Sequence, residues 1–94
     1  MLVGTRGREA VYFEGSGQIR IAGEIWGGRE DRAVVFLHGI GQTRFAWAKV
    51  AAHIVRAGWR CVLIDLRGHG ESGWAADHDY SLKAMAGDCA AIVD

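Results

Sequence analysis

The sequence predicts an α/β fold: an antiparallel hairpin, then a parallel βαβ unit and a following helix, with an incomplete sheet. Three observations carry this prediction. Apolar residues alternate at period two near the start of the chain, two continuous apolar runs follow, and two later stretches have apolar residues at helical spacing. A chain of 94 residues is long enough for one domain only. We therefore treat residues 1–94 as a single partial domain.

The hairpin is expected over about residues 9–26. Residues 9–14 have the composition of a strand, and the Gly-Ser-Gly sequence at 15–17 is typical of a turn. The second strand shows isoleucines on one face and charges on the other: Ile19, Ile21 and Ile25 against Arg20 and Glu24. This alternation predicts a half-buried strand that pairs with the first one. Residues 27–32 are polar and are expected to form a solvated loop.

The βαβ unit is expected over about residues 33–65. Residues 33–37 and 61–64 are short, continuous apolar runs, which is typical of parallel strands covered on both faces. The stretch between them carries one apolar stripe at helical spacing: Trp47, Val50, Ala51, Ile54 and Val55. Thr43 is the expected N-cap of this helix, and Gly58 its expected end. A strand, a helix and a strand of this length predict parallel strands joined by a right-handed crossover.

The last part of the chain reads as a loop and a second helix. Residues 65–79 are polar and rich in glycine, and Ser81 is the expected N-cap of a helix that starts at about residue 81. The apolar stripe of this helix consists of Leu82, Met85, Ala86, Cys89, Ile92 and Val93. No stop signal precedes Asp94, and a terminal carboxylate opposes the helix dipole. We therefore expect that the chain is cut inside or just after an element.

Composition excludes several classes of function. Eleven basic residues balance eleven acidic residues, so a nucleic-acid partner is not expected. No apolar run approaches the roughly 18 residues of a membrane span, and the start of the chain has no signal-peptide pattern. Cys61 and Cys89 are expected to be buried thiols of a cytoplasmic protein. Asp77, His78 and Asp79, with His69 nearby, match no common spacing of metal ligands, so neither a metal nor a cofactor is expected.

The loop that follows the first apolar run allows a dinucleotide-binding interpretation. Gly39 and Gly41 form G-x-G between a strand and a helix, and Asp65 ends the next strand, where a ribose-binding acid would lie. Arg44 occupies the third glycine position, however, where close packing of helix and strand leaves no room for a side chain. The preceding hairpin is also unexpected in such a domain. A dinucleotide-binding half-domain therefore remains an alternative.

Two motifs resemble loops of the α/β-hydrolase superfamily. Residues 37–44, Leu-His-Gly-Ile-Gly-Gln-Thr-Arg, resemble the loop after that family's third strand, which contributes to the oxyanion hole. Residues 65–72, Asp-Leu-Arg-Gly-His-Gly-Glu-Ser, resemble the D-x-R-G-x-G-x-S loop after its fourth strand. The motifs start about 27 residues apart, as an intervening helix requires, and the order of elements matches the family from about residue 9 to residue 94. The chain thus resembles the N-terminal segment of an α/β hydrolase, with a weaker resemblance to esterase-like and cofactor-free haloperoxidase-like members.

The resemblance implies roles for individual residues. The backbone N–H of Ile40 would be one oxyanion-hole donor, because acyl transfer builds negative charge on a carbonyl oxygen. His38 would fix the loop. The residues assigned to the substrate side of the site are His38, Gly39, Gly41, Phe45 and Trp47. The substrate would be a small molecule with an ester-like bond.

The second motif is expected to be structural. Asp65 is suited to accept backbone N–H bonds or to pair with Arg67, and Ser72 to bond the turn. Residues 70–73 superficially suggest the G-x-S-x-G nucleophile elbow, but position 74 is Trp and no strand leads directly into Ser72. Ser72 is therefore not expected to be a nucleophile.

The nucleophile, acid and histidine of the family all belong to positions beyond this chain, so the 94 residues alone are expected to be inactive. A different class of function stays open: a small non-catalytic βαβ module that binds a partner through its open sheet edge. Self-association through the same edge is expected as well, because the strand at 33–37 is apolar and carries neither Pro nor Lys.

Overall fold

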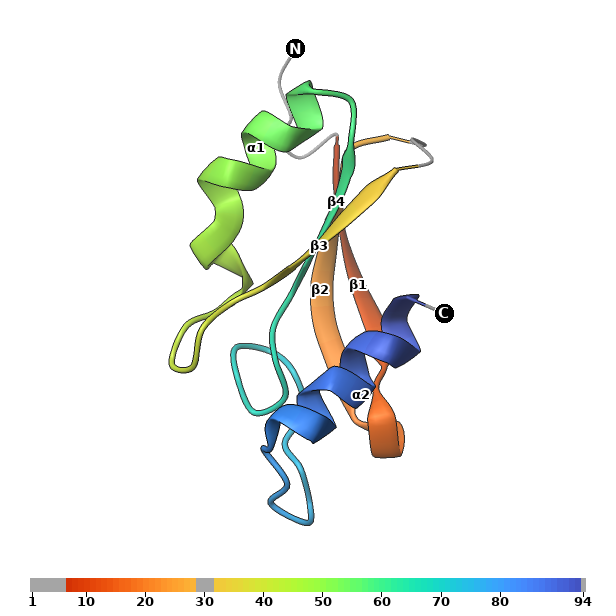
Figure 1. The fold of residues 1–94 in the computed structure, drawn as a ribbon, viewed down its shortest axis with the longest axis vertical. Coiled ribbons are helices and arrows are strands. Elements are labelled where there is room, and N and C mark those ends of the chain that lie inside the picture. The colour runs from red at the N-terminus through yellow and green to blue at the C-terminus, as the bar shows by residue number, and fades with distance from the viewer. Residues whose placement is uncertain (1–6, 29–31, 94) are drawn as a thin grey trace.

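The structure, a computed structural model, describes residues 7–28 and 32–93 and contains a mixed sheet with a helix on each face (Figure 1). The strands are β1 (Arg8–Glu14), β2 (Arg20–Trp26), β3 (Ala33–Leu37) and β4 (Arg60–Ile64), and the helices are α1 (Ala48–Arg56) and α2 (Leu82–Val93). The strand order is β1-β2-β4-β3. The predicted fold class is confirmed. The expectations for the start of the chain, for residues 29–31 and for Asp94 lie outside the described residues.

The hairpin pairs β1 and β2 antiparallel, from Arg8 opposite Trp26 to Glu14 opposite Arg20. A short 3₁₀ turn, Ser16–Gln18, connects them. The prediction that β2 is half-buried is wrong, because Ala22 and Trp26 are buried as well as Ile21. The reason is position: β2 lies inside the sheet, pairs with β4 on its other side, and contributes side chains to the cores on both faces.

The βαβ unit places β3 and β4 side by side and parallel, with Leu37 opposite Ile64 at their C-terminal ends. Strand β4 is buried from Cys61 to Ile64, as predicted. In β3 only Phe36 is buried, because β3 is the edge strand of the described sheet. The prediction that the strand is covered on both faces is therefore confirmed for β4 and wrong for β3.

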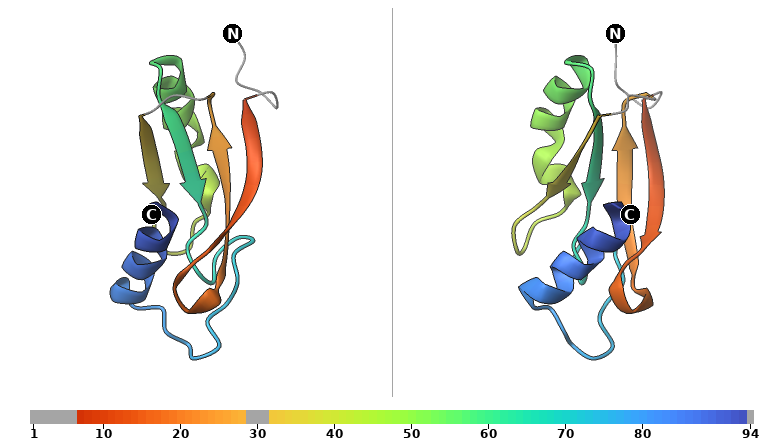
Figure 2. Two further views of the ribbon diagram at one scale, coloured as in Figure 1. Left: turned by 90° about the vertical axis from the view of Figure 1, so that its right-hand side faces the viewer. Right: turned by 45° about the vertical axis from the view of Figure 1, so that its right-hand side comes forward.

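Figure 2 shows the two helices on opposite faces of the sheet, and an apolar cluster lies under each of them. Beneath α1 lie Trp26, Phe36, Ala51, Cys61 and Leu63. On the opposite face, Ile21, Val62 and Ile64 pack with partly buried residues that include Ile92 of α2. Because alternate residues of a strand point to opposite faces, β4 supplies both clusters.

The helices depart from prediction at their ends. Helix α1 begins at Ala48, and Trp47 belongs to a preceding 3₁₀ turn, Arg44–Trp47, so Val50 is exposed instead of buried. Thr43 stands at the N-cap of that turn without a side-chain bond. In α2 the Ser81 hydroxyl accepts the N–H of Ala84 at 3.1 Å, as a cap does.

The apolar stripe predicted for α2 is largely exposed. Leu82 is 85% exposed and Val93 is also exposed, whereas Met85 is buried. The buried face of α2 instead contains Asp88, which pairs with Arg67. A buried ion pair at a position outside the predicted stripe therefore takes part in holding α2 against the rest of the fold.

Candidate active site

Two loops leave the C-terminal ends of the parallel strands and lie side by side. The β3 loop comprises residues 38–44 and the β4 loop residues 65–79 (Figure 1). The Leu66 N–H donates to His38 Nε2 at 2.9 Å, and the Gly41 N–H donates to His69 Nε2 at 3.1 Å. Because Leu37 and Ile64 are register partners, both loops start at the same level of the sheet, which allows these contacts.

The β3 loop begins with a tight turn over residues 39–42. The Gln42 N–H donates to the Gly39 carbonyl at 3.1 Å, and the Gln42 side-chain oxygen accepts the Gly39 N–H at 3.0 Å. Gly41 has φ +84°, the value that the third position of a type II turn requires and that favours glycine. The N–H groups of Gly39, Gly41 and Gln42 are thus all accepted. Among the described residues no acceptor is recorded for the Ile40 N–H.

The side chain of His38 is buried and holds the start of the β3 loop in place. Its Nδ1 lies 2.7 Å from the Gly39 carbonyl oxygen, which only accepts, so Nδ1 carries the proton and Nε2 accepts from Leu66. Both ring nitrogens are therefore engaged within the chain. This is the loop-fixing geometry that the resemblance implies.

Three apolar side chains in and near the turn are exposed. Ile40 is 74% exposed, Phe45 46% and Trp47 37%. The Trp47 indole N–H donates to the Leu37 carbonyl at 2.8 Å, and its ring centroid lies 5.4 Å from that of Phe36. The three side chains are therefore accessible from solvent, as contact with a substrate would require.

Arg44 ties the β3 loop to the β4 loop through a buried ion pair that the sequence analysis missed. Its guanidinium pairs with Asp65, which is fully buried, with Glu71 at 2.8 Å and with Glu24 at 3.3 Å. Its own N–H donates to Asp65 Oδ1 at 2.6 Å. The only sequence signal was the misfit of Arg44 in the dinucleotide motif.

These contacts stabilise the charged forms of Arg44 and Glu24. Burial opposes ionisation of Arg44, but its bond to Glu71 and the charge of Asp65 outweigh burial and raise the pKa of Arg44. Burial likewise favours neutral Glu24, yet hydrogen bonds from Trp26 and Arg8 lower the pKa of Glu24. Arg44 and Glu24 are therefore both charged at neutral pH.

Of the two roles expected for Asp65, the acceptance of backbone N–H bonds is confirmed, whereas the pairing with Arg67 is wrong. Arg67 instead forms two bonds to Asp88 of α2, at 2.8 and 2.7 Å. Asp65 already accepts Arg44 and two backbone N–H groups, those of Arg44 and Glu71, so its oxygens are occupied. The hydrogen bond to Asp88 raises the pKa of Arg67, against the effect of burial.

Ser72 is an interior part of the β4 loop. Its hydroxyl donates to the Asp65 carbonyl at 2.6 Å and accepts the Ala22 N–H at 2.9 Å. Next to it, Gly70 has φ +49°, and a Cβ there would overlap the Asp65 carboxylate. In residues 7–28 and 32–93 no hydrogen bond joins a serine hydroxyl to a histidine ring.

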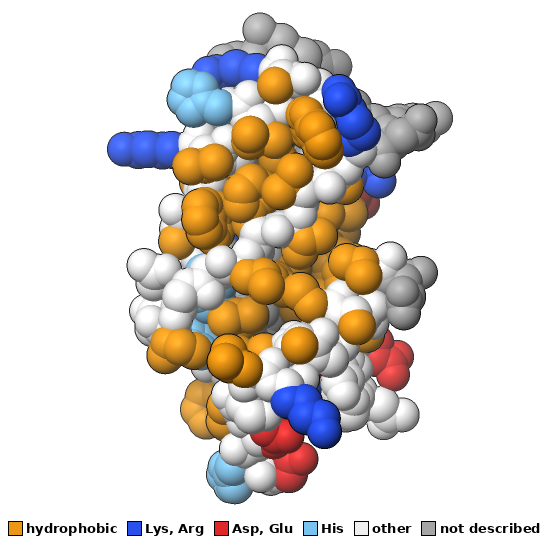
Figure 3. Space-filling model, in the orientation of Figure 1, with side chains coloured by type: hydrophobic (Ala, Val, Ile, Leu, Met, Phe, Trp, Pro, Cys, Tyr) orange, Lys and Arg blue, Asp and Glu red, His pale blue; other side chains and the backbone are white. Residues whose placement is uncertain are grey.

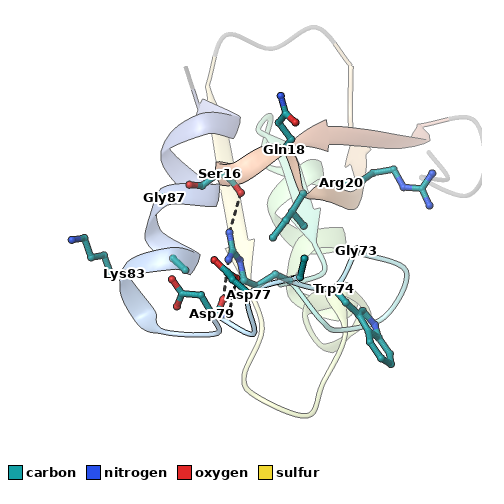
Figure 4. A pocket seen from close by; sticks show the side chains of 14 residues that line it. Ser16, Gln18, Arg20, Gly73, Trp74, Asp77, Asp79, Lys83 and Gly87 are labelled. Carbon is teal, nitrogen blue, oxygen red and sulfur yellow. Dashed lines mark hydrogen bonds between the residues drawn. The ribbon is translucent and has the colours of Figure 1, made fainter.

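A cavity of about 840 Å³ opens elsewhere, between the β1–β2 turn, the β4 loop and the start of α2 (Figure 4). Its buried cation, Arg67, is saturated by Asp88 and by the carbonyls of Ser16 and Asp79. Bonds from Ser81 lower the pKa of exposed Asp79. Its charges thus serve the fold, and the β3 loop remains the candidate site.

Within residues 7–28 and 32–93, no group of three or more His, Cys, Asp and Glu side chains is placed to hold a metal ion. Neither described helix has the length and apolar character needed to cross a membrane.

Comparisons with known proteins agree on one family. A family model described as alpha/beta hydrolase fold matches residues 32–94. Protein phosphatase methylesterase 1 of Bos taurus is 33% identical over 92 residues, covering 88% of this chain and 24% of that protein. Esterase Rv0045c of Mycobacterium tuberculosis is 46% identical over 56 residues, covering 60% of this chain and 17% of its own length.

A solved structure matches at the level of the fold. Epoxide hydrolase VrEH1 from Vigna radiata superposes with a TM-score of 0.85 and 27% identity, covering 97% of this chain and 28% of that chain. The chain spans about a quarter of the length of the first curated relatives that it matches.

Proposed function

The chain belongs to the α/β-hydrolase fold family, and we propose that it forms the N-terminal part of a serine hydrolase that cleaves an ester or related bond of a small molecule through an acyl-enzyme. In this proposal the backbone N–H of Ile40 is one oxyanion-hole donor. The nucleophile, the acid and the histidine come from residues outside these 94. No cofactor takes part in the proposed reaction.

The state of the Ile40 N–H carries the proposal. In the turn over residues 39–42, the three other N–H groups have acceptors within the chain, and the Ile40 N–H has none among the described residues. An oxyanion hole requires such a donor, because an N–H already bonded within the protein would have to break that bond to stabilise the transition state. Ile40 is also largely exposed, so a substrate can approach it.

Rigidity of the loop supports the same role. A donor is effective when it is held in place before the reaction starts. At the start of the loop the His38 ring accepts the Leu66 N–H. The His69 ring accepts the Gly41 N–H of the turn, and the Asp65 carboxylate accepts the Arg44 N–H. The donor therefore sits on a segment fixed at three points.

The test compares two substitutions at one position in the full protein encoded by the reading frame that contains this chain. Ile40→Ala keeps the donor, so we expect a modest change in kcat. Ile40→Pro removes the N–H, and the second position of a type II turn is one that proline favours, so the turn itself should persist. Losing one donor costs about 10²–10³ in kcat.

Activated aryl esters serve as substrates, and melting temperature and labelling by a fluorophosphonate are measured beside the rate. A folded, labelled Ile40→Pro protein with near-normal kcat would refute the assignment. So would an Ile40→Ala protein that is equally damaged. Absence of both ester turnover and labelling in the unsubstituted protein would refute the serine-hydrolase proposal itself.

We expect the 94-residue chain alone to show no esterase activity, because a donor without a nucleophile is only a fraction of the machinery. Turnover that a fluorophosphonate blocks and that Ser72→Ala abolishes would contradict this. We also expect the DNA downstream of codon 94 to encode a short apolar strand that ends in G-x-S-x-G within roughly 15 residues.

Opening of an epoxide is the second candidate, favoured by the structural similarity to epoxide hydrolase VrEH1. Ester cleavage places the developing charge on a carbonyl oxygen, which suits a backbone donor. Side-by-side rates on an aryl ester and on a styrene-type epoxide separate the two candidates. Faster epoxide turnover would replace the ester proposal.

The open edge of β3 is the proposed site of self-association for the isolated chain. Strand β3 pairs with β4 on one side, and its other side has no strand among the described residues. Figure 3 shows apolar side chains gathered on the face where β3 runs, and Leu37 at the end of β3 is 44% exposed. Sedimentation at tens of micromolar should reveal association. A monomer with a cooperative melt would favour the non-catalytic βαβ module.

The two cysteines are free, which fits the proposed location in the reducing cytoplasm. Cys61 is buried, whereas Cys89 is only half-buried, contrary to expectation. Burial raises the pKa of both thiols, and the nearby Asp88 carboxylate adds to the effect at Cys89. Neither is therefore proposed as a nucleophile.

A further inference from the structure

His69 contacts the turn that carries the proposed donor, although the resemblance gives it no role. Its Nε2 accepts the Gly41 N–H at 3.1 Å, across 28 positions of the sequence. In a β-turn the closing bond uses the N–H of the fourth residue and leaves the two middle N–H groups, here those of Ile40 and Gly41, without a partner in the turn. The His69 ring accepts the Gly41 N–H. The Ile40 N–H has no acceptor among the described residues.

We propose that His69 is a positioning residue for the oxyanion hole: its imidazole holds the Gly41 N–H and so leaves the Ile40 N–H as the available donor of the turn. The catalytic meaning of this inference rests on the proposed function, whereas the contact itself does not. His69 does not touch the reacting atoms in this scheme. It acts through Gly41.

The hydrogen bonds define the form of His69 that can do this. Its Nδ1 lies 3.0 Å from the Arg67 carbonyl oxygen, which only accepts, so Nδ1 carries the proton. Nε2 then offers its lone pair to Gly41. A doubly protonated ring would place an N–H opposite the Gly41 N–H, and the contact would be lost. Positioning therefore requires the neutral ring.

His38 is the titratable group that faces His69, with ring centroids 5.1 Å apart. It uses the same tautomer toward Leu66. The nearby charges are paired among themselves: Arg44 of the β3 loop with Asp65 and Glu71 of the β4 loop and with Glu24 of β2, and Arg67 with Asp88 of α2. Besides the contacts of Arg44, two imidazoles join the loops, and each accepts one backbone N–H through Nε2.

The first experiment observes the contact without activity. The 94-residue protein, labelled with ¹⁵N at glycine and histidine and kept dilute, is titrated from about pH 8 to pH 5, where imidazoles protonate. The Gly41 amide signal should move together with the His69 ring signal. In His69→Gln, whose side-chain oxygen accepts an N–H at every pH, Gly41 should not follow this titration. A Gly41 signal that ignores His69 in the unsubstituted protein would overturn the proposal.

The second experiment measures catalysis in the full protein on an aryl ester. His69→Leu removes the acceptor and should lower kcat by about 10-fold to 10²-fold, up to the loss of a whole donor, with KM little changed. His69→Gln should restore most of kcat and remove the part of the acidic fall in rate that belongs to His69. A merely structural role would lower the melting temperature of both variants and leave kcat of the folded protein intact, which would overturn the inference.

The two experiments separate this inference from the proposed function. If Gly41 follows His69 but the full protein cleaves no ester, the proposed function fails and the contact stands. If the ester is cleaved and Gly41 is indifferent to His69, the inference alone fails. Should His69→Leu not fold, the titration of the unsubstituted protein and His69→Gln still decide.

Discussion

Removing the Arg44 side chain should destabilise the protein by about 3–5 kcal/mol, which is the cost of leaving one partner of a buried ion pair alone. The size of this loss depends on Asp65, the most deeply buried of the carboxylates that pair with Arg44. Of the three carboxylates around Arg44, Glu71 is largely exposed and Glu24 keeps its bond to Arg8, so both tolerate the loss. Asp65 is fully buried and would keep two backbone N–H bonds but no counter-charge. For 94 residues the whole stability is about 5–14 kcal/mol, so the effect is a large fraction of it.

The assay is urea unfolding of Arg44→Met at low micromolar concentration, followed by tryptophan fluorescence. Arg8→Met is the matched control, because it removes an ion pair to Glu24 at the surface, where about 0–1 kcal/mol is expected. Arg44→Lys should fall between them, since one ammonium cannot bridge three carboxylates as the guanidinium does. The reasoning is refuted if Arg44→Met costs no more than Arg8→Met. The double variant Arg44→Met, Asp65→Leu should recover part of the loss, because it removes the lone buried charge but leaves two backbone N–H groups without their acceptor. If this double variant is no more stable than Arg44→Met, the lone charge of Asp65 is not the cause of the loss.

Three further predictions follow from single contacts. The pKa of Glu24 lies below its ordinary value of 4.5, so ionised Glu24 stabilises the fold above that pH, and this contribution is lost as the pH falls through the folded pKa. The free energy of unfolding of Glu24→Gln should therefore depend less on pH in the acidic range. An unchanged acid profile would contradict this. Ser72→Ala leaves the Ala22 N–H and the Asp65 carbonyl without their partner and should cost about 1–3 kcal/mol in urea unfolding, whereas a neutral result would show that water replaces the hydroxyl. Because burial raises the Cys61 pKa, iodoacetamide should modify Cys61 only after unfolding and more slowly than Cys89, and mass spectrometry of the time course checks the order.

Local patterns were sufficient to predict the elements and their pairing. The apolar runs that became β3 and β4 and the helix between them are features of adjacent residues, and a crossover of that length permits only parallel pairing. The stop of α1 near Gly58 follows from φ +94° at that residue, a conformation that glycine adopts without strain. The position of Ile40 in the loop after β3 followed from the same patterns, whereas its assignment as a donor came from the family resemblance.

The partners of charged residues could not be predicted in this way. Arg44 and Asp65 are 21 positions apart, as are Arg67 and Asp88, and nothing in their immediate neighbours distinguishes one pairing from another. Asp65 was expected either to accept backbone N–H bonds, which it does, or to pair with Arg67, two positions away, which it does not, because Arg44 is its partner. The burial of β2 and the partial exposure of Val35 depend likewise on which strands lie next to β2 and β3, a property of the whole sheet.

The site differs from the rest of the fold in what holds it. Elsewhere the layers are joined mainly by apolar side chains, apart from the Arg67–Asp88 pair at α2, and apolar contacts tolerate small shifts because dispersion and burial are not directional. The β3 and β4 loops are joined by hydrogen bonds and by the ion pairs of Arg44 with Asp65 and Glu71, whose strength falls steeply with angle and distance. A donor for a transition state needs the second kind of support, since an error of about 1 Å costs on the order of 10² in rate. The β4 loop carries no proposed catalytic group, yet it provides His69, Asp65 and the Leu66 N–H that orient the turn. Substitutions in this loop should therefore reduce kcat of the full protein even where the melting temperature is unchanged.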